Sequence, residues 1–336
     1  RSYTEIAGES RSMHKSQGFG AARSRGQRTD YLQHKAGEQA KTDVFDGIDL
    51  TWNRVPGGAA VSGKIGQIYQ RFDAENPAAS VPALLEVHRD FDRLPQDDYY
   101  VQLKKKELAD LIVACAGLFV EANAAAYAGT PGQPLRVYAF AVKRSDVPVQ
   151  WQSVRLAGTG KDTAVAKDLK NNESLNLPVS VTIPKETPLT QPYWLAQPHP
   201  QGMYAVDEQT LIGRPESVPP LVAVFRVKIA GTDFDLARPL AYKWVDPVQG
   251  ELYRPFEVRP AVMANLDEKV LVFSTSDSKP MGVLLKAGAA AVQGNVRLEA
   301  PKGWRVSPAS LPFDLAKPEA EQSVVFQVTP PAGASD

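Results

Sequence analysis

The chain has little cysteine and histidine, and the few such residues lie far apart. Cys115 is the single cysteine among 336 residues, which excludes both a disulfide framework and a cysteine-built metal site. The four histidines occupy four different segments, without an HxxH or HExxH pair: His14, His34, His88 and His199. The sequence therefore predicts no metal, zinc included, bound by this chain alone, and no other cofactor.

Net charge and long apolar runs are also missing. Lys and Arg number 38, as do Asp and Glu, so no overall charge favours nucleic acid or an anionic membrane as a partner. The longest apolar stretch, residues 111–120, is far shorter than the roughly 20 residues that span a bilayer. Arg1 is not an initiator methionine and no signal-peptide pattern follows it, so we expect the chain to be part of a longer protein.

Residues 61–127 have the pattern of a small helical bundle. One helix is expected to end at Asn76-Pro77, and another to begin after Ser80 as N-cap. A third is predicted in a proline-free stretch, because apolar residues recur there at steps of three and four. The apolar stripe of that third helix is Leu108, Leu111, Ile112, Cys115, Leu118 and Phe119.

Beyond Gly132 the pattern changes to short strands separated by Gly, Pro, Asn and Asp. Strands at this spacing are typical of antiparallel sandwiches rather than of a parallel α/β sheet. The predicted strands after Pro247 are 256–258, 270–273, 283–285, 296–298, 304–306 and 324–328. The predicted fold class is multidomain α+β: a small helical bundle (43–130) followed by two antiparallel, immunoglobulin-like β-sandwich domains (131–250 and 251–336).

The first residues differ from both patterns. Ser2–Gln17 is predicted to be one helix, with Ser2 as N-cap and Glu5 as its capping-box partner. Residues 18–42 are polar, basic and rich in glycine, so they are either a long loop or ordered only against another domain. His14, with Arg11 and Gln17, either contributes to a neighbouring pocket or is the solvated end of this helix.

The aromatic residues Tyr193, Trp194 and Tyr204 gather in a proline-rich segment. They either stack on sugar rings, as a glycan contact, or pack the loop onto the protein, because aromatic rings stabilise mainly through buried area. Polar residues near them are Gln191, Gln197, Gln201 and Asp207. His199 is expected in a surface turn and His88 at the boundary of a helix.

Catalytic and nucleotide-binding motifs are absent from the sequence. There is no Gly-x-Ser-x-Gly, Walker A or dinucleotide fingerprint, and Gly18-Phe-Gly20 and Gly158-Thr-Gly160 lack the remaining glycines. We therefore predict no catalytic residue in this chain.

Several segments resemble the large bacterial forms of the PIG-L (LmbE-like) deacetylase family. Residues 3–20, with Arg11, His14 and Gln17, are similar to the end of its catalytic domain, and Phe45–Arg54 to the segment that follows. The resemblance continues through 190–195, 202–204, 211–216 and 242–255. The resemblance implies that residues 1–42 are the terminal helix and loop of a deacetylase-like domain.

The last segment has a likeness of its own. Residues 299–331, with Gly303-Trp304 and Val324–Val328, are similar to immunoglobulin-like modules that accompany carbohydrate-active enzymes. In that pattern Trp304 is expected to fill the core of the second sandwich.

The family resemblance implies a zinc hydrolase that removes acetyl groups from N-acetylglucosamine-type sugars, in the periplasm or outside the cell. Its zinc is held by a His-Pro-Asp-Asp motif and a later histidine, and His199-Pro200-Gln201 has neither aspartate. The implied function of this chain is that of a non-catalytic C-terminal accessory region, partnered by its own catalytic domain and by a glycan. The alternative is a non-enzymatic adhesion or scaffold protein whose sandwiches bind protein partners.

Overall fold

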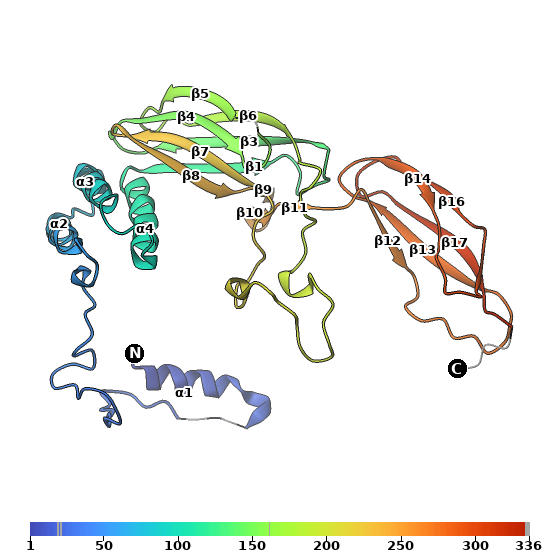
Figure 1. The fold of residues 1–336 in the computed structure, drawn as a ribbon, viewed down its shortest axis with the longest axis horizontal. Coiled ribbons are helices and arrows are strands. Elements are labelled where there is room, and N and C mark those ends of the chain that lie inside the picture. Colours follow the sequence, from blue (N-terminus) through green and yellow to red (C-terminus); the bar gives the residue numbers. More distant parts are fainter. Residues whose placement is uncertain (19, 21, 161, 333–336) are drawn as a thin grey trace. The chain divides into compact units, whose positions relative to one another are not determined.

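The computed structural model describes residues 1–18, 20, 22–160 and 162–332 (Figure 1). The chain divides into two compact units, residues 1–54 and 55–336. The fold class is the predicted one, with a few helices followed by antiparallel strands that form sandwiches. In the described part of the chain, the helices are too short or too polar to cross a membrane.

The first unit contains α1 (Tyr3–Met13) and two 3-10 turns, η1 (Lys15–Gln17) and η2 (Trp52–Arg54). Ser2 caps α1 as predicted, since its side chain accepts from the Glu5 backbone N–H at 3.3 Å. The predicted single helix to Gln17 is wrong, because His14 leaves helical geometry (φ −79°, ψ 57°) and ends α1.

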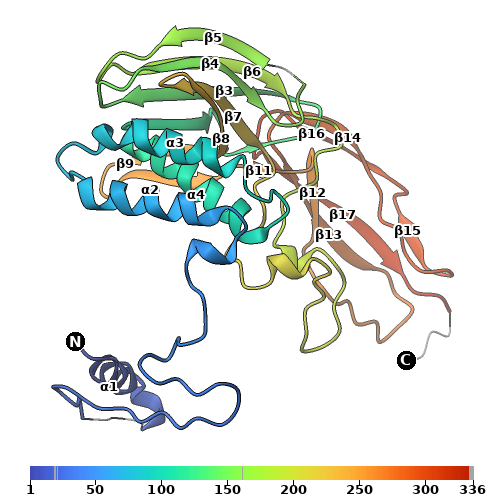
Figure 2. The ribbon, with the colours of Figure 1, turned by 60° about the vertical axis from the view of Figure 1, so that its left-hand side comes forward.

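Three helices form the expected bundle: α2 (Gly58–Arg71), α3 (Val81–Phe91), which follows η3 (Pro77–Ser80), and α4 (Tyr99–Cys115) (Figure 2). Ser80 occupies the N-cap position of α3, although its side chain makes no capping hydrogen bond. Asp98 caps α4 by accepting from the backbone N–H groups of Tyr100 and Val101. The helix faces that meet are apolar, with Val87, Phe91 and Ile112 almost fully buried.

The predicted continuation of the third helix through Leu118 and Phe119 is wrong. Gly117 adopts φ +62°, a left-handed conformation that ends α4 and that glycine adopts without steric cost. The chain then enters strand β1 (Leu118–Ala124). The span 43–130 therefore contains β1 and β2 (Ala128–Gly129) as well as helices.

The first sandwich has a five-stranded sheet in the order β10-β9-β1-β3-β6 and a four-stranded sheet in the order β5-β4-β7-β8. The remaining strands of the first sheet are β3 (Pro134–Lys143), β6 (Leu175–Thr182), β9 (Ala241–Asp246) and β10 (Gly250–Pro255). The second sheet consists of β4 (Val149–Leu156), β5 (Asp162–Asp168), β7 (Val222–Ile229) and β8 (Thr232–Pro239).

Each sheet of this sandwich buries one face. In β1 the buried and partly exposed positions alternate, as in β3 up to Ala141. Trp151 is fully buried in the core, where its ring lies 5.5 Å from that of Phe225 and its Nε1–H donates to the Ser153 carbonyl at 3.0 Å. The opposite face of the five-stranded sheet is left open for the groove described below.

The second sandwich pairs a four-stranded sheet, β12-β13-β17-β15, with a two-stranded antiparallel sheet, β14-β16. Its strands are β12 (Val262–Leu266), β13 (Lys279–Ala287), β14 (Val292–Val296), β15 (Arg305–Ser307), β16 (Leu311–Leu315) and β17 (Glu321–Thr329). A short parallel pair, β2 with β11 (Glu257–Val258), precedes it. Residues 333–336 of the predicted second domain lie outside the described residues.

Two expectations for this sandwich are wrong. Residues 270–273 are irregular rather than a strand. Trp304 is only half-buried, and it packs edge-on against Phe273 at 5.1 Å, whereas Phe326 is the aromatic residue of the core. Trp304 directly precedes β15, which is a three-residue strand at the edge of its sheet.

Candidate functional site

The three rings predicted as glycan contacts lie in the long connection between β6 and β7, and they form two separate pairs. Tyr193 and Trp194 make an edge-to-face contact at 4.9 Å, and the Tyr193 hydroxyl donates to the Arg214 carbonyl at 3.1 Å. Tyr204 instead contacts the ring of His199 at 5.0 Å. Thr190 ties the connection to β11, because its backbone N–H donates to the Val258 carbonyl and its hydroxyl accepts from the Val258 N–H, both at 2.8 Å. The glycan contact of the three rings stays a prediction.

The polar group at the end of α1 is brought together in part. His14 Nδ1 lies 2.7 Å from Gln17 Oε1, on an exposed surface. The backbone carbonyl of Arg11 accepts from the His14 N–H at 3.1 Å. The contribution of these three residues to a pocket stays a prediction.

The side chains needed for a zinc centre are not assembled. Among the described residues, no three His, Cys, Asp or Glu side chains lie where they could hold a metal ion together. His88 lies against Phe234 of β8, ring to ring at 5.1 Å, and burial lowers its pKa. His199 is exposed in a turn beside the Pro200 carbonyl. The donor set of the described residues therefore does not fit the zinc that the family resemblance implies.

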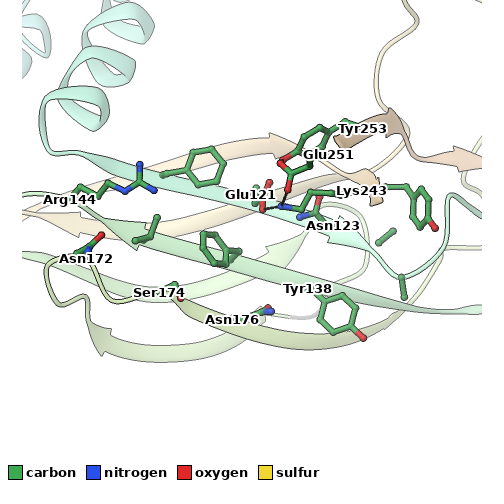
Figure 3. A pocket seen from close by; sticks show the side chains of 16 residues that line it. Glu121, Asn123, Tyr138, Arg144, Asn172, Ser174, Asn176, Lys243, Glu251 and Tyr253 are labelled. Carbon is green, nitrogen blue, oxygen red and sulfur yellow. Dashed lines mark hydrogen bonds and ion pairs between the residues drawn. The ribbon is translucent and has the colours of Figure 1, made fainter. Parts of the chain in front are cut away.

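A groove of about 830 Å³ lies on the outer face of the five-stranded sheet (Figure 3). It is lined by side chains of β1, β3, β6, β9 and β10 and of the adjoining turns. These residues are Phe119, Glu121, Asn123, Ala124, Ala125, Tyr138, Phe140, Val142, Arg144, Asn172, Ser174, Asn176, Tyr242, Lys243, Glu251 and Tyr253. The volume falls within the range of ligand-binding clefts in proteins.

Strand alternation and pairing register position these side chains. Along β1, Phe119, Glu121 and Asn123 point to the groove, because the residues between them point into the sandwich core. The antiparallel register sets Glu121 opposite Phe140 of β3. Phe140 is in turn opposite Asn176 of β6, so one transverse row continues across three strands.

Charged groups on β9 and β10 extend the lining of the groove beyond this row. Lys243 Nζ lies 2.8 Å from Glu121 Oε1 and 3.5 Å from Glu251 Oε2. Tyr253, its register partner on β10, places its ring 5.4 Å from that ammonium, and its hydroxyl donates to Glu251. The hydrogen bond with Glu121 raises the pKa of Lys243, so the lysine stays charged.

Aromatic rings make up the apolar part of the groove. Phe119 and Phe140 meet edge to face, with their centroids 6.2 Å apart. Phe119 and Tyr253 are each 51% exposed. Neighbouring exposed rings on a sheet face are typical of a binding surface rather than of a face that contacts only solvent. An open strip of rings flanked by hydrogen-bonding groups is typical of a surface that binds a ligand having both apolar and polar faces.

The two ends of the groove differ in chemistry, as Figure 3 shows. Arg144, Asn172 and Ser174 lie at one end, and Tyr138 lies toward the other. The left-handed conformation of Asn172 (φ +58°) is one that asparagine tolerates better than most residues. Arg144 thus places a cation at one end of the groove.

The sequence analysis missed these residues because it assigned residues 118 and 119 to a helix. A period-two signal is present: Phe119, Glu121 and Asn123 alternate with Val120, Ala122 and Ala124. Ala122 and Ala124, which point into the core, weaken that signal because alanine has the highest helix propensity of all residues. With β1 identified, its outer face would have been a candidate surface.

The comparisons with known proteins give one family match. Residues 284–336 match the model of the NPCBM-associated, NEW3 domain of alpha-galactosidase. The matched segment begins in β13 and includes β17, and its residues 333–336 lie outside the described residues. No curated protein matches the chain.

Among solved structures, the chain is similar to Spo0M, a sporulation control protein from Bacillus subtilis. The identity is 7%, and the alignment covers 63% of this chain and 90% of that chain with a TM-score of 0.23. A score of that size supports no conclusion about fold or function.

Proposed function

We propose that this chain is a non-catalytic accessory region that holds a carbohydrate-active enzyme on a glycan. The observation that carries the proposal is the groove on the five-stranded sheet, where exposed rings lie beside amides and charged groups in one concave surface. The match of residues 284–336 to a domain of alpha-galactosidase supports it.

The chemistry of sugars fits such a surface. A pyranose ring presents a face of C–H groups, which stacks on an aromatic ring, and a rim of hydroxyl groups that donate and accept hydrogen bonds. The groove offers Phe119 and Phe140 for the first, and Asn123 and Asn176 for the second. An asparagine amide both donates and accepts, as a sugar hydroxyl does.

The enzyme is proposed to be a PIG-L-like, zinc-dependent de-N-acetylase acting on N-acetylglucosamine-type sugars. The support is the family resemblance of residues 3–20, 45–54 and 242–255. Its zinc and catalytic base belong to a separate catalytic domain in this proposal, because the donor set of this chain does not fit a zinc centre. Reading the coding sequence upstream tests this directly: a His-Pro-Asp-Asp motif supports the proposal, and its absence contradicts it.

Retention on an insoluble N-acetylglucosamine polymer tests the glycan function. The whole chain should be retained, with an affinity in the micromolar to millimolar range. The double variant Phe119→Ala/Phe140→Ala should lose about tenfold or more in affinity, because two of the rings of the groove are removed. Melting temperatures of all variants are measured alongside, to separate lost binding from lost folding.

A matched variant removes two rings from the connection between β6 and β7 instead. Tyr193→Ala/Trp194→Ala should remain bound to the polymer. Loss of retention in this variant alone would move the glycan site to the loop and leave the function standing. Absence of retention in the wild-type chain would favour an adhesion or scaffold role.

A further inference from the structure

We propose that the groove is selective for an uncharged, N-acetylated sugar chain and rejects the same chain once its amino groups are free. This inference rests on the proposed function, since it requires that the groove binds a glycan. It concerns which form of the glycan is held, and the arrangement of four charged side chains carries it.

The two carboxylates of the groove are already engaged by the protein. Glu121 and Glu251 both lie within ion-pair distance of Lys243, at 2.8 Å and 3.5 Å. The side chains of Glu121 and Lys243 are only 16% and 29% exposed. An ammonium group on a ligand would have to displace Lys243 to reach Glu121, and would leave a half-buried lysine without its partner.

The fourth charge is a cation at the polar end of the groove. Arg144 is exposed there beside Asn172, and its guanidinium has no ion-pair partner among the residues that the structure describes. A protonated amino sugar placed near Arg144 is repelled, whereas an acetylated one carries no charge to repel. Arg144 thus repels a polycationic ligand at one end of the groove, and Lys243 occupies the two carboxylates with which such a ligand would otherwise pair.

The uncharged side chains suit the acetamido group itself. The amides of Asn123 and Asn176 can donate to its carbonyl oxygen and accept from its N–H. Its methyl group is apolar and can lie against the Phe119 or Phe140 ring. A free amino group still donates hydrogen bonds, but it lacks the carbonyl oxygen and the methyl group and so loses the contacts made by both.

This selectivity has a consequence for the proposed enzyme. Hydrolysis of the amide adds water across its C–N bond, releases acetate and leaves an amine that takes up a proton. A groove that binds only the acetylated form holds the enzyme on unreacted polymer and releases the product. The accessory region would then direct the enzyme toward substrate rather than toward polymer that has already reacted.

Titration of the whole chain with two soluble hexamers tests the inference, at a pH where free amino groups are protonated. The N-acetylglucosamine hexamer should bind at least about tenfold more tightly than the glucosamine hexamer. In Arg144→Gln the ratio of the two affinities should fall to about threefold, because one repulsive charge is removed. Lys302→Gln, an exposed charge removed from the second sandwich, is the matched control and should keep the wild-type ratio.

The possible failures are distinct. Equal or tighter binding of the glucosamine hexamer overturns the selectivity while the proposed glycan function stands. Tighter binding of an oligogalacturonate than of the acetylated hexamer also overturns it, since the groove would then serve an anionic glycan. If the ratio of the two hexamer affinities is the same in Arg144→Gln as in Lys302→Gln, the role of Arg144 is wrong. If the chain binds no sugar at all, the proposed function is wrong as well.

Discussion

At the scale of single residues, Trp151 and Trp304 both follow strand-like sequence patterns, yet their surroundings differ. Trp151 is fully buried against Phe225, whereas Trp304 is half-buried beside Phe273 at the end of a sheet. Trp151→Ala should therefore lower the free energy of unfolding by about 3–5 kcal/mol. Trp304→Ala should lower it by about 1–2 kcal/mol, since less area is lost.

Urea unfolding of both variants, followed by circular dichroism, provides the comparison. Equal losses in the two variants would mean that the surroundings of the two rings are misassigned. A loss below about 0.5 kcal/mol for Trp304→Ala would place its ring on the open surface.

Asp46 gives a prediction about pH. The backbone N–H of Thr42 donates to its carboxylate at 2.8 Å, as does that of Lys41, and these bonds lower its pKa from 3.8 to about 2. Because the pKa is lowered by folding, the stabilisation of this turn is complete above about pH 3.8 and is lost as the pH falls through about 2. NMR titration of the Asp46 carboxyl carbon measures this directly, with Asp46→Asn to assign the signal. A midpoint near 3.8 would show that the turn does not form.

At the scale of elements, Gly117 decides where α4 ends and β1 begins. Its φ is +62°, and a Cβ placed there would lie 2.9 Å from the Arg144 carbonyl oxygen. Gly117→Ala should therefore destabilise the protein by about 1–3 kcal/mol, through backbone strain and this clash.

Gly63→Ala is the matched control. Gly63 lies inside α2 and a Cβ there would meet nothing within 4 Å, so alanine should stabilise the helix by up to about 1 kcal/mol. Thermal unfolding of the two variants should move in opposite directions. A shift of the same sign and size in both would contradict the structural role of Gly117.

Local sequence patterns predict some elements well and others poorly. The period of two in Val324, Phe326 and Val328 predicts β17, and the structure buries all three side chains. The helical period in 108–115 is also correct for α4, but it continues by chance into Leu118 and Phe119. The helix nevertheless ends at the left-handed conformation of Gly117, which cannot be read from the sequence.

The candidate groove is harder to predict than the fold. Glu121 and Lys243 are 122 residues apart in the sequence, and only the pairing order of five strands brings them together. Sequence reasoning selected Tyr193, Trp194 and Tyr204 because they are neighbours in the chain. The rings of the groove, such as Phe119 and Tyr253, come from separate strands and share no local motif.

At the scale of the whole molecule, the account predicts a chain that needs a separate catalytic domain. The purified chain should hold no stoichiometric zinc and should release no acetate from N-acetylated sugars, because its histidines lie in separate segments. Metal analysis after washing with a chelator checks this. One tightly held zinc per chain would contradict it, and would require a donor set assembled in some other way.

The central claim is that the face of β1 and β3 binds a glycan, and the ring signals of Phe119 and Phe140 report on it most directly. Fluorine NMR of two samples, one labelled with fluorophenylalanine and one with fluorotryptophan, is followed during titration with N-acetylglucosamine hexamer, with each ring assigned by substitution. The account predicts that the Phe119 and Phe140 signals shift together along one binding curve, while a labelled Trp194 stays unchanged. Shifts at Trp194 with unchanged Phe119 and Phe140, or no shifts at all, would contradict it.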